Sequence, residues 1–111
     1  MKLNEAQDMR FSLSDLDDVI GSRAGDDPEK SYTAFLLQAG VSTCAQKVGE
    51  EATETVIAAM GQTDEQLIGE SADLLYHLLV LLRCRGIGLD QVLVELERRT
   101  SRSGHEEKAA R

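Results

Sequence analysis

The chain reads STCAQKVGEEATETVIAAM from Ser42 to Met60, and this stretch decides the fold. Small and apolar side chains recur in it at the spacing of one helix face: Cys44, Ala45, Val48, Ala52, Val56 and Ala59. Gly61 ends the pattern, and Thr63 and Gln66 then have the spacing of a capping box, which begins a second helix. We therefore predict two long helices, over residues 42–60 and about 64–85, which pack antiparallel because their connection is short.

Leucine dominates the second long helix, whose predicted core face comprises Leu67, Ser71, Leu74, Leu75, Leu78 and Leu82. Shorter helical patterns flank the pair. One begins with Ser14 as its N-cap and ends at residues 21–25, a second covers 32–38 and stops at Gly40, and a third covers 89–99. No stretch alternates with the period of a strand. The predicted fold class is all-α: an antiparallel helix pair with short flanking helices, completed as a four-helix-type bundle by dimerisation.

Composition limits the classes of function. The 111 residues suffice for one domain, which we place at residues 12–100, between a polar leader (1–11) and a disordered tail (101–111). The net charge of −8 argues against binding nucleic acid through its phosphates. The longest apolar run, residues 74–82, is far shorter than the ~20 residues of a membrane span. No signal segment is visible and the two cysteines have no metal-binding spacing, so we expect a cytoplasmic protein with reduced thiols and no membrane partner.

Acidic side chains gather on both long helices, with a lysine and a histidine among them: Lys47, Glu50, Glu51 and Glu54 on the first, and Glu70, Asp73 and His77 on the second. In an antiparallel pair, Glu51 and Glu54 can face Glu70 and Asp73. Two carboxylates about 4 Å apart repel by about 4 kcal/mol at an effective dielectric constant near 20. Such a cluster must take up protons or hold a divalent cation, and oxygen ligands suit Mg²⁺.

A purely structural interpretation of these acids stays open. Acids on helix faces are usually solvated, and Lys47 with Glu51 is also an ordinary i,i+4 pair. The metal interpretation is favoured by the position of Asp73 and His77, which lie in the middle of a leucine-rich helix where an unpaired acid is costly.

The spacing of the acids resembles a family signature. Glu50-Glu51-x-x-Glu54 followed by Glu70-x-x-Asp73 is similar to the EExxE…ExxD pattern of the all-α NTP pyrophosphohydrolases, the MazG-like superfamily. The strings at residues 31–33, 45–59 and 69–77 narrow the resemblance to the phosphoribosyl-ATP pyrophosphohydrolase family, over about residues 12–100.

The resemblance implies an activity and a set of residues. It implies Mg²⁺-dependent hydrolysis of 1-(5-phosphoribosyl)-ATP to 1-(5-phosphoribosyl)-AMP and pyrophosphate, the second step of histidine biosynthesis. The implied metal ligands are Glu51, Glu54, Glu70 and Asp73. Glu50, beside Glu51 in the catalytic site, binds a second ion or takes a proton from the attacking water. The candidates for contact with the substrate are Lys30, Lys47, His77 and Tyr32, although His77 and Tyr32 have equally good alternatives as a supporting and a packing residue.

The apolar positions on the long helices extend over a wide arc, to Ile57 and Met60 on the first and to Val80 and Leu81 on the second. Short helices cannot cover all of this surface, so we expect a homodimer, as the resemblance also implies. Two other functions stay open at this point. One is a house-cleaning nucleoside triphosphate pyrophosphatase, and the other is a non-catalytic helical dimerisation module.

Overall fold

The structure, a computed structural model, describes residues 10–101, and every regular element in this range is a helix. In chain order the helices are α2 (Leu13–Arg23), α3 (Tyr32–Ala39), α4 (Val41–Gly61), α5 (Asp64–Cys84) and α6 (Leu89–Thr100). The all-α prediction is confirmed. Most of the predicted leader and tail lies outside the described residues.

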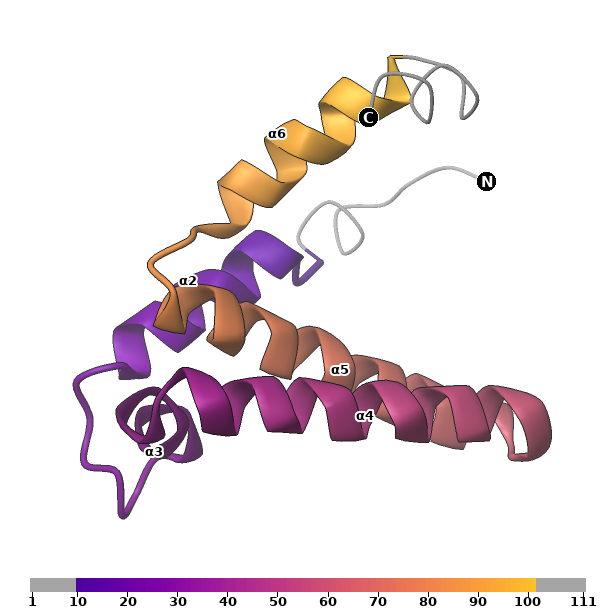
Figure 1. Ribbon diagram of the computed structural model, residues 1–111, viewed down its shortest axis with the longest axis horizontal. Helices are drawn as coiled ribbons and strands as arrows, with labels where there is room; N and C mark the ends of the chain where they lie inside the picture. Colours follow the sequence, from indigo (N-terminus) through magenta and orange to yellow (C-terminus); the bar gives the residue numbers. More distant parts are fainter. Residues whose placement is uncertain (1–9, 102–111) are drawn as a thin grey trace.

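Helices α4 and α5 form the antiparallel hairpin on which the rest of the molecule is built (Figure 1). The capping box is present at its turn: the Thr63 hydroxyl accepts a hydrogen bond from the Gln66 amide at 3.2 Å, and the Gln66 side chain accepts one from the Thr63 amide at 3.0 Å. These two bonds satisfy N–H groups that have no partner within the helix. Gly40, at φ +98°, separates α3 from α4 in a conformation that suits glycine.

The cap of α2 differs from the prediction. Ser12, not Ser14, is the N-cap: its hydroxyl accepts from the Asp15 amide at 3.0 Å, and the Asp15 carboxylate accepts from the Ser12 amide at 2.9 Å. Both serines have an acid three residues later, so their spacing is the same. Because Ser12 is the cap, the Asp17 carboxylate is available for a salt bridge with Arg83 of α5, at 3.3 Å. This salt bridge connects α2 to the hairpin.

The core lies where α2 and α3 pack on the hairpin, and its buried residues are Ile20, Leu36, Cys44, Leu79, Val80 and Leu89. Part of the predicted core face of α5 was wrong, because Leu75 and Leu78 are 42% and 37% exposed. Helix α5 contacts α2 and α3 as well as α4. Because of these additional neighbours, the buried side chains of α5 are His77, Leu79 and Val80.

The two cysteines are free thiols that lie side by side in this core. The Sγ atoms of Cys44 and Cys84 are 3.2 Å apart, and the Cys44 thiol also donates to the carbonyl of Leu36. Burial and the hydrogen bond with Cys84 raise the pKa of Cys44 to about 12, so this thiol is protonated at neutral pH.

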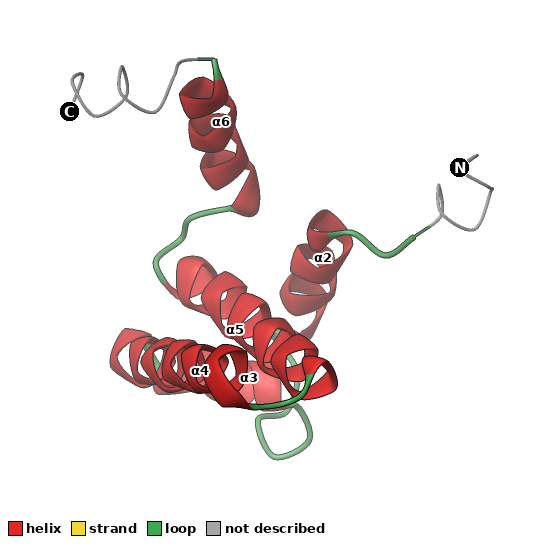
Figure 2. Cartoon of the chain, turned by 90° about the vertical axis from the view of Figure 1, so that its right-hand side faces the viewer, coloured by secondary structure: helices red, strands yellow, loops and turns green. Residues whose placement is uncertain are grey.

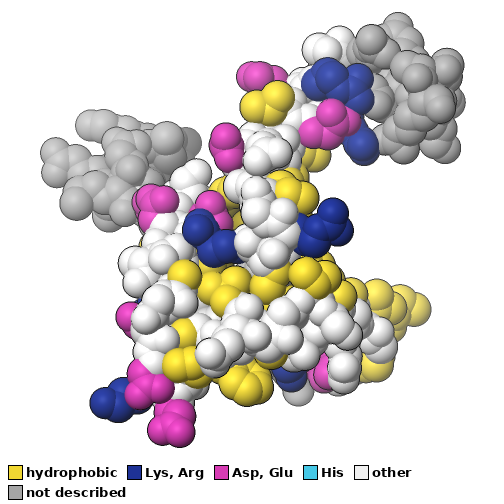
Figure 3. Space-filling view, turned by 60° about the vertical axis from the view of Figure 1, so that its left-hand side comes forward, with side chains coloured by type: hydrophobic (Ala, Val, Ile, Leu, Met, Phe, Trp, Pro, Cys, Tyr) yellow, Lys and Arg dark blue, Asp and Glu magenta, His cyan; other side chains and the backbone are white. Residues whose placement is uncertain are grey.

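Apolar side chains are exposed toward the turn of the hairpin. Val56, Ile57 and Met60 of α4 are 61%, 53% and 83% exposed, and Ile68 of α5 is 69% exposed. Figure 3 shows apolar side chains at the surface in the lower part of the molecule, where the hairpin lies. The expectation of uncovered apolar surface is confirmed at Ile57 and Met60. It was wrong at Val80, which is fully buried, and at Leu81, which packs against the core.

Helix α6 extends away from the hairpin (Figure 2), and its apolar side chains Leu93, Val94 and Leu96 are also exposed. Among the described helices, none combines the length and the apolar character that crossing a membrane requires.

Candidate active site

Three acidic side chains meet halfway along the hairpin. Glu51 of α4 and Glu70 and Asp73 of α5 each place a carboxylate oxygen within 4.8 Å of the others. Glu70 and Asp73 share a face of α5 because they are three residues apart. Glu54, one turn after Glu51, lies close enough to Glu51 and Glu70 to perturb both carboxyls. The structure thus brings together the four side chains that the sequence predicted as metal ligands.

The electrostatics of this acid cluster (Glu51, Glu54, Glu70 and Asp73) are unfavourable without a cation. Burial raises the pKa of Glu51, and the carboxylates of Glu54 and Asp73 raise it further. A hydrogen bond with Glu54, followed by desolvation, raises the pKa of Glu70. The Oε2 atom of Glu51 is buried and has no hydrogen-bond partner. An unpartnered buried acceptor amid carboxylates is suited to a hard divalent cation, so the donor set fits Mg²⁺.

Two further predicted residues lie beside the cluster on α4. Glu50 is exposed, next in sequence to Glu51. Lys47 is half-buried, and its charge acts on the Tyr32 hydroxyl. No ion pair joins Lys47 to Glu51 in the described part of the chain. These two side chains therefore do not form the i,i+4 ion pair that their spacing allows.

A hydrogen-bonded chain links the acid cluster to Tyr32. His77 is only 6% exposed, and its Nδ1 atom donates to the Asp73 carbonyl at 2.7 Å, since a carbonyl only accepts. In the neutral ring, Nε2 then accepts from the Tyr32 hydroxyl at 2.9 Å. Both nitrogens of His77 are therefore engaged within the protein, which favours its supporting role over direct contact with phosphate. Tyr32 comes from α3 of the same chain.

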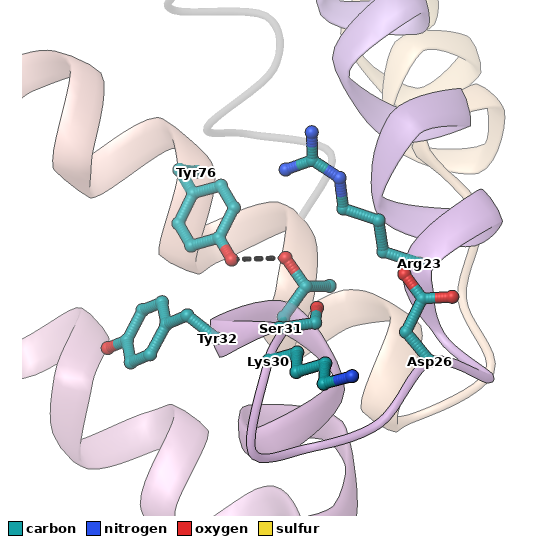
Figure 4. Close-up of a pocket in the computed structure, with 7 residues that line it drawn as sticks. Arg23, Asp26, Lys30, Ser31, Tyr32 and Tyr76 are labelled. Atoms are coloured by element: carbon teal, nitrogen blue, oxygen red, sulfur yellow. Dashed lines mark hydrogen bonds between the residues drawn. The ribbon is translucent and has the colours of Figure 1, made fainter.

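A pocket of about 380 Å³ lies on the other side of Tyr32 (Figure 4). It is lined by Arg23, Asp26, Lys30, Ser31, Tyr32, Thr33 and Tyr76. The Tyr76 hydroxyl is hydrogen-bonded to Thr33, the dashed line in Figure 4, and this bond fixes α3 on α5. The rings of Tyr32 and Tyr76 lie roughly parallel, with their centroids 6.2 Å apart.

Sequence reasoning singled out Lys30 and Tyr32, which line this pocket, but it did not single out Arg23 and Tyr76, which line it too. Arg23 ends α2 and Tyr76 belongs to the middle of α5, so only tertiary packing brings them together. A second hollow, of about 430 Å³, is lined by Glu70 and Asp73 together with Gln62, Gln66 and Gly69.

The fold and the acid cluster define the class of this protein. An antiparallel helix pair that gathers EExxE and ExxD carboxylates is the arrangement expected of an all-α pyrophosphohydrolase. Comparison with known proteins gives the family. The model of the phosphoribosyl-ATP pyrophosphohydrolase family matches residues 13–100. The chain therefore belongs to the phosphoribosyl-ATP pyrophosphohydrolase family.

Relatives are similar over nearly the whole chain. A phosphoribosyl-ATP pyrophosphatase of Azorhizobium caulinodans is 55% identical over 102 residues, which cover 92% of this chain and 94% of the relative. The protein of that name from Erythrobacter litoralis is 56% identical over 100 residues, covering 90% and 96%. Phosphoribosyl-ATP pyrophosphatase 1 of Bradyrhizobium diazoefficiens is 55% identical over 102 residues, covering 92% and 96%.

Proposed function

We propose that this protein hydrolyses 1-(5-phosphoribosyl)-ATP to 1-(5-phosphoribosyl)-AMP and pyrophosphate, the second step of histidine biosynthesis. Water is added across the anhydride bond between the α and β phosphates. The observation that carries the proposal is the cluster of Glu51, Glu70 and Asp73, in a chain whose relatives bear the name of this activity. Because the substrate is a nucleotide of central metabolism, we also propose a cytoplasmic location.

The proposed cofactor is Mg²⁺, held by Glu51, Glu54, Glu70 and Asp73. Its expected contribution is to offset negative charge on the phosphates and to make a bound water more acidic. The buried, unpartnered oxygen of Glu51 supports this assignment. The hollow beside Glu70 and Asp73 supports it as well, since Mg²⁺ in nucleotide enzymes is shared between carboxylates and substrate phosphates.

The other side chains take separate roles. Glu50 is exposed beside the cluster and is proposed to accept the proton of the attacking water. Lys47, whose charge acts on the Tyr32 hydroxyl, is proposed to contact phosphate. His77 positions Tyr32 through the hydrogen bond at 2.9 Å, and Tyr32 then presents its half-exposed ring to the nucleotide.

We further propose that the protein is a homodimer. The exposed apolar side chains toward the hairpin turn, Val56, Ile57, Met60 and Ile68, are typical of a surface that another chain covers. A second copy of the hairpin would bury them in a four-helix-type bundle.

One assay tests the function against its rivals. Pyrophosphate release is measured from phosphoribosyl-ATP and from common nucleoside triphosphates, with Mg²⁺ and with EDTA. We expect release from phosphoribosyl-ATP with Mg²⁺ only. Comparable rates on common triphosphates would indicate a general pyrophosphatase, and no release from any of them would leave a non-catalytic helical module.

A variant pair makes the assay specific for the cluster. Glu51→Gln is expected to lose turnover. Glu65→Gln is the matched control, because it removes the same charge from the exposed first turn of α5, outside the cluster. Loss of activity in both variants would show that net charge, not the cluster, is responsible.

A further inference from the structure

The pocket on the far side of Tyr32 concentrates positive charge in an acidic protein. Arg23 and Lys30 both line it, with Asp26 as its one acid, whereas the whole chain carries a net charge of −8. Within the described residues neither Arg23 nor Lys30 has an ion-pair partner within 4 Å. Two cations around one cavity, without such a partner, favour an anionic ligand, and a guanidinium suits the oxygens of a phosphate.

The position of this pocket relative to the acid cluster restricts the ligand. Tyr32 is common to both: it lines the pocket, and its hydroxyl is hydrogen-bonded to His77, which is bonded to the carbonyl of Asp73. In Figure 4 Arg23 and Lys30 lie on the side of the pocket opposite to the Tyr32 ring. A ligand that starts at the acids and ends in the pocket therefore passes the aromatic rings. It needs one anionic group for the proposed Mg²⁺ at the acids and another for the two cations of the pocket.

We propose that Arg23 and Lys30 bind the phosphate monoester on the ribosyl group that the substrate carries in addition to ATP. This inference rests on the proposed function, whose substrate has a triphosphate at one end and this monoester at the other. The tyrosine rings line the path between the two ends, where a base or ribose packs against them. The pocket thus selects substrates that carry a second, remote phosphate over ordinary nucleoside triphosphates.

The proposal is tested by measuring kcat/KM for wild type and three variants on two substrates. The substrates are phosphoribosyl-ATP and 1-ribosyl-ATP, which lacks only the remote phosphate. We expect Arg23→Gln and Lys30→Gln each to lower kcat/KM about tenfold on phosphoribosyl-ATP, as the loss of a charged phosphate contact should. Neither variant should change kcat/KM on 1-ribosyl-ATP. Arg85→Gln, an exposed residue outside the pocket, is the control for net charge and should change neither value.

Two outcomes would overturn the assignment. An equal loss on both substrates would place Arg23 and Lys30 at the triphosphate, and unchanged kcat/KM on both would remove them from the site. Both side chains are exposed, so the variants should keep the helical circular dichroism of the wild type.

A binding measurement separates failure of the pocket from failure of the proposed reaction. Ribose 5-phosphate, the isolated end of the substrate, is titrated without Mg²⁺ while the amide resonances of residues 30–33 are followed by NMR. Saturable shifts, with a Kd raised about tenfold in Arg23→Gln, would support the pocket even if phosphoribosyl-ATP is not turned over. Absence of shifts, or the same Kd in wild type and variant, would refute the pocket even if turnover is normal.

Discussion

One carboxylate oxygen of Glu51, on α4, is buried without a hydrogen-bond partner. The carboxyls of Glu54 and Asp73 lie close enough to repel the charge of Glu51. Burial and these neighbours raise the pKa of Glu51 above its value in the unfolded chain, so the folded protein holds this proton more tightly. The charged carboxyl therefore destabilises the metal-free fold at neutral pH. This penalty disappears as the pH falls below the unfolded pKa, about 4.3.

Glu51→Gln should therefore abolish turnover and yet raise the melting temperature in EDTA. The gain over wild type should be largest at pH 7 and should shrink toward pH 4, where wild-type Glu51 is protonated as well. Thermal unfolding in EDTA at several pH values measures this gain. A variant that is less stable than wild type at pH 7, or that retains near-normal activity, contradicts the assignment of Glu51.

The bond between Tyr32 and His77 allows a second test on single residues. Tyr32→Phe leaves the buried Nε2 of His77 without its partner, at a cost of about 1–3 kcal/mol in the free energy of unfolding. Urea denaturation measures the loss. Gln38→Ala, at an exposed position on the same helix, is the control and should change stability by less than about 0.5 kcal/mol. A Tyr32→Phe variant with the same free energy of unfolding as wild type would mean that the hydrogen bond to His77 does not stabilise the fold.

At the scale of helices, periodicity and caps predict the elements well, because each signal is local. The capping box of Thr63 and Gln66 is present as expected, and the bounds of α3, α4 and α6 agree with the predicted ones to within a residue. The predicted start of α2 was wrong for a local reason as well. Two overlapping Ser-x-x-Asp patterns occur there, and either serine could be the N-cap. In the structure Ser12 is the N-cap, and Asp17 forms a salt bridge with Arg83 of α5.

A pair of serine variants tests this cap directly. Ser12→Ala removes the observed N-cap of α2 and should lower the free energy of unfolding by about 1 kcal/mol. Ser14→Ala, at an exposed site within the helix, should be neutral or slightly stabilising because alanine favours helix. Urea denaturation of both variants is the measurement. The opposite order of stabilities would restore Ser14 as the cap.

Contacts between elements were less predictable than the elements. The acid cluster was predictable because Glu51 and Glu54 share one helix face, Glu70 and Asp73 share another, and the short turn makes the two faces meet. Arg23 and Tyr76 share a pocket only because α2, α3 and α5 pack together, and no spacing in the sequence reports this. The burial of Leu79 in place of Leu78 has the same origin, since α5 has neighbours on two sides.

The whole molecule should respond to Mg²⁺ through the acid cluster. A ligand that binds only the folded state stabilises it by RT ln(1 + [L]/Kd), about 2.7 kcal/mol at a hundredfold excess over Kd. Millimolar Mg²⁺ should therefore raise the melting temperature of wild type but scarcely that of Glu70→Gln. Equal shifts in the two proteins would point to a general ionic effect, and equal shifts with NaCl at matched ionic strength would confirm that interpretation.

The exposed apolar surface near the hairpin turn should determine how the chains assemble. Met60 and Ile57 are 83% and 53% exposed, and in a homodimer a charge placed at either of them would be buried without a partner. We expect wild type to sediment near twice its chain mass of 12.2 kDa, and Met60→Asp and Ile57→Asp to shift toward the monomer. Gln46→Asp adds the same charge at an exposed polar position of α4 and should remain dimeric. Sedimentation equilibrium at micromolar concentration decides the matter, because a fully active wild type at the mass of one chain would refute the dimer.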